Sequence, residues 1–181
     1  MNEKQKLIIY PNNLLFKKSV EVSAITDKTK ETINDMIKVL NQFGGAGLSA
    51  VQIGKLKRIV VISCGKYEDA PLVLINPEIK HLSKEKDIFY EGCLSFPGVF
   101  DEIERSVSAT IKYKDLDFKQ QEIILSNEES ECVQHEIEHL DGKIFLDHLS
   151  RLKRSIHLKR LKKNIKKYIR KQHEEKSLSL Y

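Results

Sequence analysis

Two histidines and a glutamate late in the chain have the spacing of a metal site. In His135-Glu136-Ile137-Glu138-His139 the imidazoles are four residues apart, so in a helix both lie on one face and reach the same cation. Glu136 lies beside them and can transfer a proton. The alternative is a solvated helix that contains these residues by chance. The spacing favours a mononuclear metal hydrolase.

A catalytic metal site also needs a third protein ligand and one open position for water. Phe145 occupies the position where the longer metalloprotease pattern places a third histidine, and we expect His148 to be an ordinary polar residue. Cys132 lies one turn before His135, but a helical cysteine is more often a small buried side chain. Cys93 lies in a glycine-containing turn that can expose a thiolate. The residues alone leave the choice between the two cysteines open.

The periodicity of apolar residues predicts the helices and strands that surround this site. The segment Asp27–Phe43 has the apolar spacing of an amphipathic helix, with Thr26 or Asp27 as its N-cap. The glycine-rich run 44–47 predicts its end. The β-branched runs 58–63 and 72–75 predict short strands, the second bounded by Pro77. Alternation over 107–113 and 123–125 predicts an antiparallel hairpin. Strands therefore cluster in the middle of the chain.

Two further helices are predicted in the last third of the chain. The first carries the histidines, with Ser126 and Glu129 as a capping box and Gly142 just past its end. The second runs from Ser150 to about Gln172. The predicted fold class is α+β, with antiparallel strands packed around a central metal-binding helix, an N-terminal helix and a basic C-terminal helix.

The basic residues of the chain are concentrated near its C-terminus, and the composition argues against a membrane or secreted protein. Residues 151–171 hold 11 Lys and Arg and no acid, while the remainder holds 20 Lys and Arg against 26 Asp and Glu. Clustered basic residues on one helix are typical of a polyanion-binding surface. The apolar runs are too short to span a bilayer, no signal-peptide core is present, and three cysteines at unrelated spacings suit a reducing compartment. We expect no membrane and no DNA partner.

Three segments together resemble the signature motifs of the peptide deformylases. They are Gly45-Ala46-Gly47-Leu48-Ser49-Ala50-Val51-Gln52, Glu91-Gly92-Cys93-Leu94-Ser95, and Gln134-His135-Glu136-Ile137-Glu138-His139-Leu140-Asp141-Gly142. The resemblance extends from about Leu7 to Leu149. It implies removal of the formyl group from the N-terminal formylmethionine of nascent polypeptides, with release of formate.

The resemblance also implies roles for single residues. The ligands of one divalent metal ion are implied to be Cys93, His135 and His139, with Fe²⁺ in the cell and Zn²⁺, Ni²⁺ or Co²⁺ able to replace it. The implied catalytic groups are Glu136 as acid and base, and Gln52 and the Leu94 amide as donors to the oxyanion. The implied substrate-binding residues are Gly45 and Gly47, which line the cleft, and the pair Glu91 and Arg105, which is structural or orients substrate.

Four residues depart from the family's pattern, among them Phe16, which occupies a position where the family often has arginine. Ser49 replaces the more usual alanine and Glu138 the more usual aspartate, and we expect both to point away from the ligand face. Glu131 lies on the metal helix near the pocket for the methionine side chain. It either faces that pocket or is a solvated helix glutamate.

The resemblance implies a division of the chain and a set of partners. Residues 1–149 form the catalytic part, and residues 150–181 form a basic helix and tail of the same single domain. The implied partners are N-formylmethionyl nascent peptides and the ribosome, the latter through the basic helix. The expected location is the bacterial cytoplasm or an organelle matrix. The alternatives are a zinc metallopeptidase that uses the same histidine pair and a noncatalytic relative that binds RNA.

Overall fold

Two antiparallel sheets and three α-helices make up the computed structural model, which describes residues 7–178 and the side chains of residues 7–165. The larger sheet has the order β1-β2-β3-β6-β7, formed by Gly47–Ser49, Ile59–Ile62, Leu72–Leu82, Ser108–Lys114 and Gln120–Ser126. The smaller sheet pairs β4 (Lys86–Gly92) with β5 (Phe100–Ser106). The helices are α1 (Asp27–Phe43), α2 (Glu128–Leu140) and α3 (Arg151–Leu178). The predicted α+β class is confirmed.

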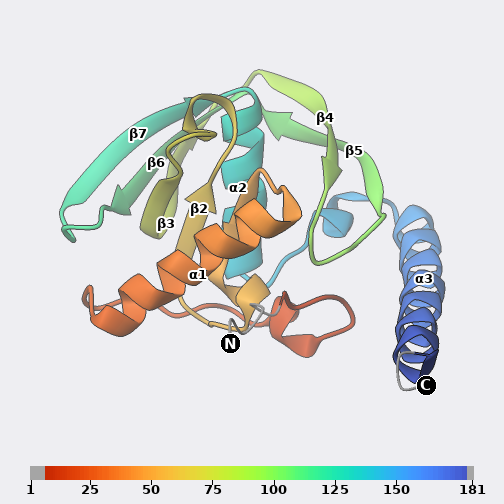
Figure 1. Ribbon diagram of the computed structural model, residues 1–181. Helices are drawn as coiled ribbons and strands as arrows, with labels where there is room; N and C mark the ends of the chain where they lie inside the picture. Colours follow the sequence, from red (N-terminus) through yellow and green to blue (C-terminus); the bar gives the residue numbers. More distant parts are fainter. Residues whose placement is uncertain (1–6, 179–181) are drawn as a thin grey trace.

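Helix α2 runs through the middle of the fold, with the larger sheet on one side and β4 and β5 on the other (Figure 1). Its apolar residues Cys132, Val133, Ile137 and Leu140 belong to a core cluster shared with β2, β3, β6 and β7. Burial of each large apolar side chain stabilises the fold by about 1.5–3 kcal/mol. The helix that carries the histidines is therefore held rigidly from several directions.

The predicted N-terminal helix is confirmed with its caps. The hydroxyl of Thr26 accepts a hydrogen bond from Thr29 N, and Gly44 ends α1 in the left-handed conformation with φ of 69°. Glycine adopts this conformation without the steric penalty of a β-carbon. The buried face of α1 meets β1 and β2 in a second core cluster, which includes Met36 and Leu40.

The predicted hairpin is confirmed as β6 and β7, but the predicted end of the preceding strand is wrong. Strand β3 continues beyond Pro77 to Leu82, with a register shift between Ile75 and Glu78. Asn76 takes a positive φ of 51° at the shift, and its side-chain amide makes two hydrogen bonds with the backbone of Val22. Proline has no N–H to donate to a neighbouring strand, and the register shift leaves Pro77 unpaired. Pairing with β6 therefore resumes at Glu78.

The predicted capping box of α2 is also wrong. Ser126 is the last residue of β7 and pairs with Ser108, while Asn127 is the N-cap and makes no side-chain cap bond. A side chain committed to the end of a strand does not reach back over the helix. Gly142 does follow the helix end as predicted, with φ of 74°.

Helix α3 lies at the edge of the molecule, beyond β5 (Figure 1). Leu161 on α3 is fully buried in a third core cluster with Phe96 and Phe145. The predicted helix is confirmed in its backbone, whereas the side chains of residues 166–171 in the basic segment lie outside the described part. Within the described residues no helix is long and apolar enough to cross a membrane.

Candidate metal centre

Three side chains from two separate motifs converge beside α2. One ligand atom each from Cys93, His135 and His139 lies within 4.8 Å of the other two. The thiol of Cys93 comes directly after β4, 3.2 Å from Nε2 of His139. The imidazoles are buried on one face of α2, with ring centroids 5.0 Å apart. One sulfur and two nitrogen donors around a common point form a three-ligand set of the kind that catalytic sites use.

The structure separates the two cysteines that the sequence left as alternatives. Cys132 does not belong to the three-residue cluster, and its sulfur faces β1, where a β-carbon on Gly47 would come within 2.5 Å of it. A contact with the Cys64 thiol and burial together raise the pKa of Cys132. A buried thiol that keeps its proton is a poor metal ligand.

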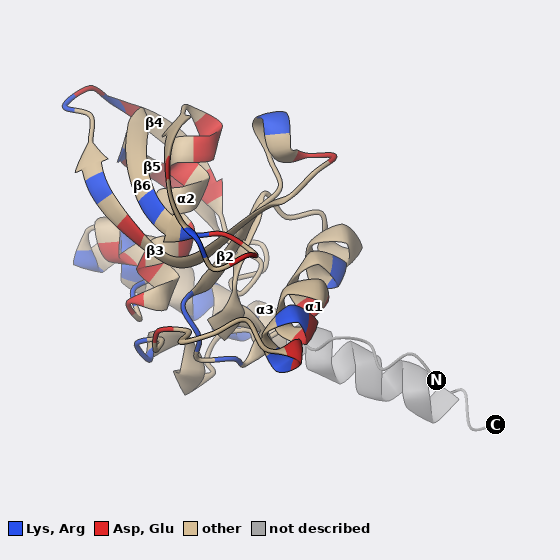
Figure 2. Cartoon of the chain, turned by 90° about the vertical axis from the view of Figure 1, so that its left-hand side faces the viewer, with Lys and Arg blue, Asp and Glu red and all other residues tan. Residues whose placement is uncertain are grey.

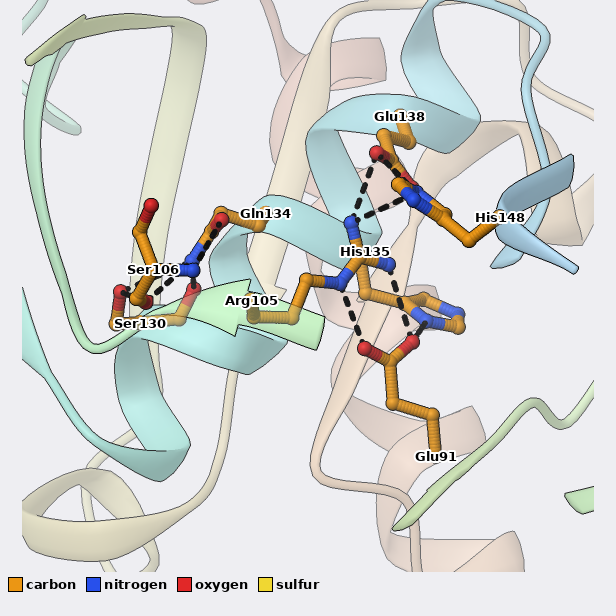
Figure 3. A network of polar contacts seen from close by, with 8 residues as sticks. All are labelled: Glu91, Arg105, Ser106, Ser130, Gln134, His135, Glu138 and His148. Atoms are coloured by element: carbon orange, nitrogen blue, oxygen red, sulfur yellow. Dashed lines mark hydrogen bonds and ion pairs between the residues drawn. The ribbon is translucent and has the colours of Figure 1, made fainter. Parts of the chain in front are cut away.

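A buried ion pair holds the ring of His135 in place (Figure 3). Nδ1 of His135 lies 2.9 Å from Oε2 of Glu91, which leaves Nε2 toward the cluster. Arg105 donates to both oxygens of Glu91 at 2.6 and 3.0 Å. Burial raises the pKa of Glu91, but the hydrogen bonds from His135 and Arg105 outweigh burial and lower it. A carboxylate on the far nitrogen of a metal-binding histidine fixes its tautomer and raises its basicity.

Glu138 extends this network on the side away from the metal cluster, as expected. Its Oε1 accepts from Arg105 at 2.8 Å and lies 2.8 Å from Nε2 of His148. Burial raises the pKa of Glu138, but the bonds with His148 and Arg105 outweigh it, so the pKa is lowered. This role of Glu138 and His148 could not be predicted from local patterns, because Arg105 lies more than 30 residues from either in the chain.

Ser49 does not point away from the site, and that expectation is wrong. Its hydroxyl lies 2.5 Å from Oε2 of Glu136 and 2.7 Å from the backbone oxygen of the same residue. The close approach of β1 to α2 at Gly47, where a β-carbon would meet Glu136 Cγ at 3.0 Å, brings Ser49 within reach. Burial raises the pKa of Glu136, while the nearby His135 and the Ser49 hydroxyl oppose this shift.

Gln52 and Leu94 present hydrogen-bond donors beside Cys93. The Gln52 side chain accepts from Ser49 N at 2.8 Å, which orients its amide so that Nε2 lies 3.2 Å from Ser95 Oγ and 3.5 Å from Cys93 Sγ. The backbone N–H of Leu94 has no backbone partner among the described residues. Both groups can therefore donate to an oxygen placed next to Cys93.

A cavity of about 840 Å³ opens beside these groups. Its wall contains Gly45, Gly47, Gln52, Leu94 and Glu136 together with two of the clustered ligands. Glu91 and Arg105 are not part of the wall and lie behind His135 instead. Glu131, for which the sequence left two interpretations, does line the cavity.

The two histidines and Cys93 fit a bound divalent cation better than they fit two protonated imidazoles. Burial lowers the pKa of His135, but hydrogen bonds with Cys93 and Glu91 outweigh it, so the pKa rises well above its usual value. Burial and then the neighbouring His135 hold the pKa of His139 well below the usual value. The imidazoles therefore do not both carry protons, and a metal ion satisfies both nitrogens at once.

Comparisons with known proteins agree with the geometry. Residues 4–155 match the family model described as polypeptide deformylase. A peptide deformylase from Wolbachia sp. subsp. Drosophila simulans is 40% identical over 179 residues, which cover 93% of this chain and 97% of the relative.

Solved structures give the same result. The crystal structure of a peptide deformylase from Legionella pneumophila matches with a TM-score of 0.87 and 35% identity, over 93% of this chain and 99% of that one. A peptide deformylase from Ehrlichia chaffeensis in complex with actinonin matches with a TM-score of 0.82 and 34% identity, over 87% and 95% of the two chains.

Proposed function

Because this chain belongs to the polypeptide deformylase family, we propose that Cys93, His135 and His139 hold its metal ion and that Glu136 moves the proton during deformylation. The family's enzymes are metal-dependent hydrolases that remove the formyl group from the N-terminal formylmethionine of nascent polypeptides, and this chain is such an enzyme. The observation that carries the assignment of residues is the convergence of the three ligand atoms within 4.8 Å, with Cys93 and His135 at the wall of a cavity.

We propose Fe²⁺ as the metal in the cell, with Zn²⁺, Ni²⁺ or Co²⁺ able to replace it. A thiolate with two imidazoles suits each of these ions. Bound there, a divalent ion supplies hydroxide at neutral pH by lowering the pKa of water and polarises the formyl oxygen. Thiolate ligation of Fe²⁺ makes the site sensitive to oxidation.

The side chains supply positioning and proton transfer. Glu136 accepts a proton from the attacking water on a carboxylate oxygen and passes it to the departing amine, which leaves as the N-terminus of methionine. Gln52 Nε2 and Leu94 N–H donate to the formyl oxygen as negative charge develops on it. Removal of one such donor typically lowers the rate by about 10²–10³.

The remaining residues support these groups. We propose Glu91 and Arg105 as positioning residues, because they hold His135 from behind and do not line the cavity. A β-carbon at Gly45 or Gly47 would collide with Leu94 or Cys132, so close packing requires glycine at both positions. We propose that both glycines line the cleft in which the substrate backbone lies.

A direct assay tests the proposed roles. Anaerobically purified, Fe²⁺-loaded protein is incubated with formyl-Met-Ala-Ser, and release of formate and of a free amine is measured. We expect turnover by the wild type and, for Glu136→Gln, loss of turnover with the metal retained. Cleavage of internal peptide bonds would support the metallopeptidase alternative, which the comparisons do not favour.

We also propose that α3 docks on ribosomal RNA and belongs to the same domain as residues 1–149. Acidic and basic residues are interspersed over α1 and the strands (Figure 2), whereas residues 151–171 contain 11 Lys and Arg without an acid. The burial of Leu161 against Phe96 and Phe145 supports a single domain. The bacterial relatives support a location in the cytoplasm, where nascent chains are made.

Co-sedimentation with ribosomes at low salt tests the docking. We expect binding to fall when the chain is truncated after Ser150, and also when the exposed Lys159, Arg160 and Lys163 are changed to glutamine. The second variant keeps the packing of Leu161, so it separates charge from folding. Binding that is equal in all three proteins, with the same salt dependence, would contradict the proposal.

A further inference from the structure

Glu131 stands out among the residues that line the cavity. Apolar side chains form much of the wall, among them Leu7, Ile9, Phe43, Leu94 and Phe100. Two carboxyl groups face this space among the described lining residues, Glu136 and Glu131. The first is bonded to Ser49 and is used by the reaction. The second has no part in the mechanism above.

Helix geometry places Glu131 next to the reacting centre. It precedes His135 by four residues on α2, so the two side chains lie on one face, about 6 Å apart along the helix axis. One oxygen of Glu131, one nitrogen of His135 and one oxygen of Glu91 lie within 4.8 Å of one another. The carboxyl group therefore lies beside the metal ligands and not on the outer surface of the helix.

The carboxyl group of Glu131 lacks a partner of opposite charge. No hydrogen bond or ion pair to it is found among the side chains that the structure describes. The nearby basic groups are bonded elsewhere: Arg105 to Glu91 and Glu138, and His135 Nδ1 to Glu91. Burial, and then repulsion by Glu91, raises the pKa of Glu131 to about 7. A carboxyl group in a largely apolar wall costs free energy unless a donor or a cation meets it.

A bound substrate can bring such a partner. The formyl carbon must lie against the three ligands and Glu136, and the β-carbon of the first residue is only three bonds from that carbon. Because one oxygen of Glu131 lies within 4.8 Å of a nitrogen of His135, a long side chain on that residue can reach the Glu131 carboxyl group. A carboxyl group there distinguishes a side chain that ends in a donor from one that ends in a methyl group.

We propose that Glu131 is a specificity-determining residue that accepts a hydrogen bond or a positive charge from the side chain of the formylated first residue. The enzyme then cleaves formyl peptides that begin with lysine or glutamine as well as formylmethionine. This inference rests on the proposed function of the metal centre, because it assumes where the formyl group binds.

A substrate panel tests the inference in the full-length, Fe²⁺-loaded enzyme. The peptides are formyl-X-Ala-Ser, with X as methionine, norleucine, glutamine or lysine; norleucine matches the stem of lysine without its amine. The proteins are the wild type, Glu131→Gln, Glu131→Leu and the control Glu128→Gln. Glu128 is exposed on the same helix and lies outside the cavity, so its variant removes an equal charge.

We expect the ratio of kcat/KM for lysine over norleucine to fall at least about tenfold in Glu131→Leu. It should also fall, by less, in Glu131→Gln, which keeps an acceptor oxygen, and should match the wild type in Glu128→Gln. Should Glu131→Leu fail to fold, the near-isosteric glutamine variant decides by the same ratio.

Unchanged ratios in both Glu131 variants, with formyl-Met-Ala-Ser still cleaved, would overturn the inference alone. Failure of the wild type to deformylate formyl-Met-Ala-Ser would overturn the proposed function, and the inference with it. The methionine peptide therefore separates the two failures.

Discussion

At the scale of single residues, the site depends on contacts that bring distant parts of the chain together. Ser49 and Glu136 are 87 positions apart, yet the hydroxyl of one lies 2.5 Å from the carboxyl group of the other. The proton-transfer role of Glu136 could be predicted from the sequence, but the orientation of its carboxyl group could not. That orientation depends on how closely β1 approaches α2 at Gly47.

Ser49→Ala tests whether this contact positions Glu136. A hydrogen bond to a charged group contributes about 1.5–3 kcal/mol, so we expect kcat with formyl-Met-Ala-Ser to fall about tenfold or more. KM should stay unchanged, because Ser49 does not line the cavity. Steady-state kinetics measure both constants. Ser126→Ala, at an exposed position, is the control, and a raised KM with normal kcat in Ser49→Ala would contradict the positioning role.

At the scale of elements, β4, β5 and α2 are joined by the buried charges of Glu91 and Arg105 and by the partly buried Glu138. Burial lowers the pKa of Arg105, but the bonds with Glu91 and Glu138 outweigh it, so the pKa is raised and the guanidinium stays charged. Removal of one partner of a buried pair leaves the other charge without compensation.

Arg105→Met should therefore lower the free energy of unfolding by about 3–5 kcal/mol. Lys86→Met is a matched control, because it breaks an ion pair of 2.7 Å between the same two strands in which both side chains are more than half exposed. We expect a loss of about 0–1 kcal/mol for the control. Chemical denaturation measures both, and equal losses would show that the buried pair contributes nothing beyond a surface pair.

The contact between β5 and α3 should depend on pH. Asp101 on β5 lies 3.0 Å from Nζ of Lys153 and 2.8 Å from Nε2 of His157. Burial raises the pKa of Asp101, but the bonds from His157 and Lys153 outweigh it and lower the pKa. A carboxyl group whose pKa is lower in the folded state stabilises the fold above its unfolded pKa, and this stabilisation is lost as the pH falls through the folded value.

Unfolding of the wild type and of Asp101→Asn at a series of pH values tests this contact. The wild type should be more stable at pH 6, and the difference should vanish as the pH falls below about 4. A difference that stays constant down to pH 2 would contradict the assignment to ionised Asp101.

Helix boundaries show what local patterns predicted and what they missed. Thr26 and Gly44 cap α1 as the sequence indicated, because both signals act within one turn of the helix. Ser126 did not cap α2, because pairing with β6 uses it as the end of a strand. Strands β1, β4 and β5 were not predicted, since their residues carry little apolar alternation and are specified by partners elsewhere in the chain.

At the scale of the whole molecule, the packing of α3 against the rest of the chain decides whether the protein is one domain. The charge of the segment could be read from the sequence, whereas the burial of Leu161 follows from a packing partner that only the folded chain supplies.

Leu161→Ala tests whether α3 is part of the domain. Truncation of a fully buried leucine costs about 2–5 kcal/mol, and we expect a single cooperative unfolding transition at a lower temperature. Leu152→Ala is the control, because Leu152 on the same helix is 72% exposed. Thermal unfolding followed by circular dichroism measures both; an unchanged midpoint for Leu161→Ala would indicate that α3 does not contribute to the stability of the domain.

Metal content shows whether the sulfur of Cys93 and the imidazoles of His135 and His139 hold one cation. The wild type, Cys93→Ala and Cys132→Ala are loaded with Co²⁺ without oxygen, and bound metal is measured by elemental analysis together with the thiolate-to-metal absorption band. We predict one equivalent and the band in the wild type and in Cys132→Ala, and loss of both in Cys93→Ala. Normal binding by Cys93→Ala with loss in Cys132→Ala would contradict the account.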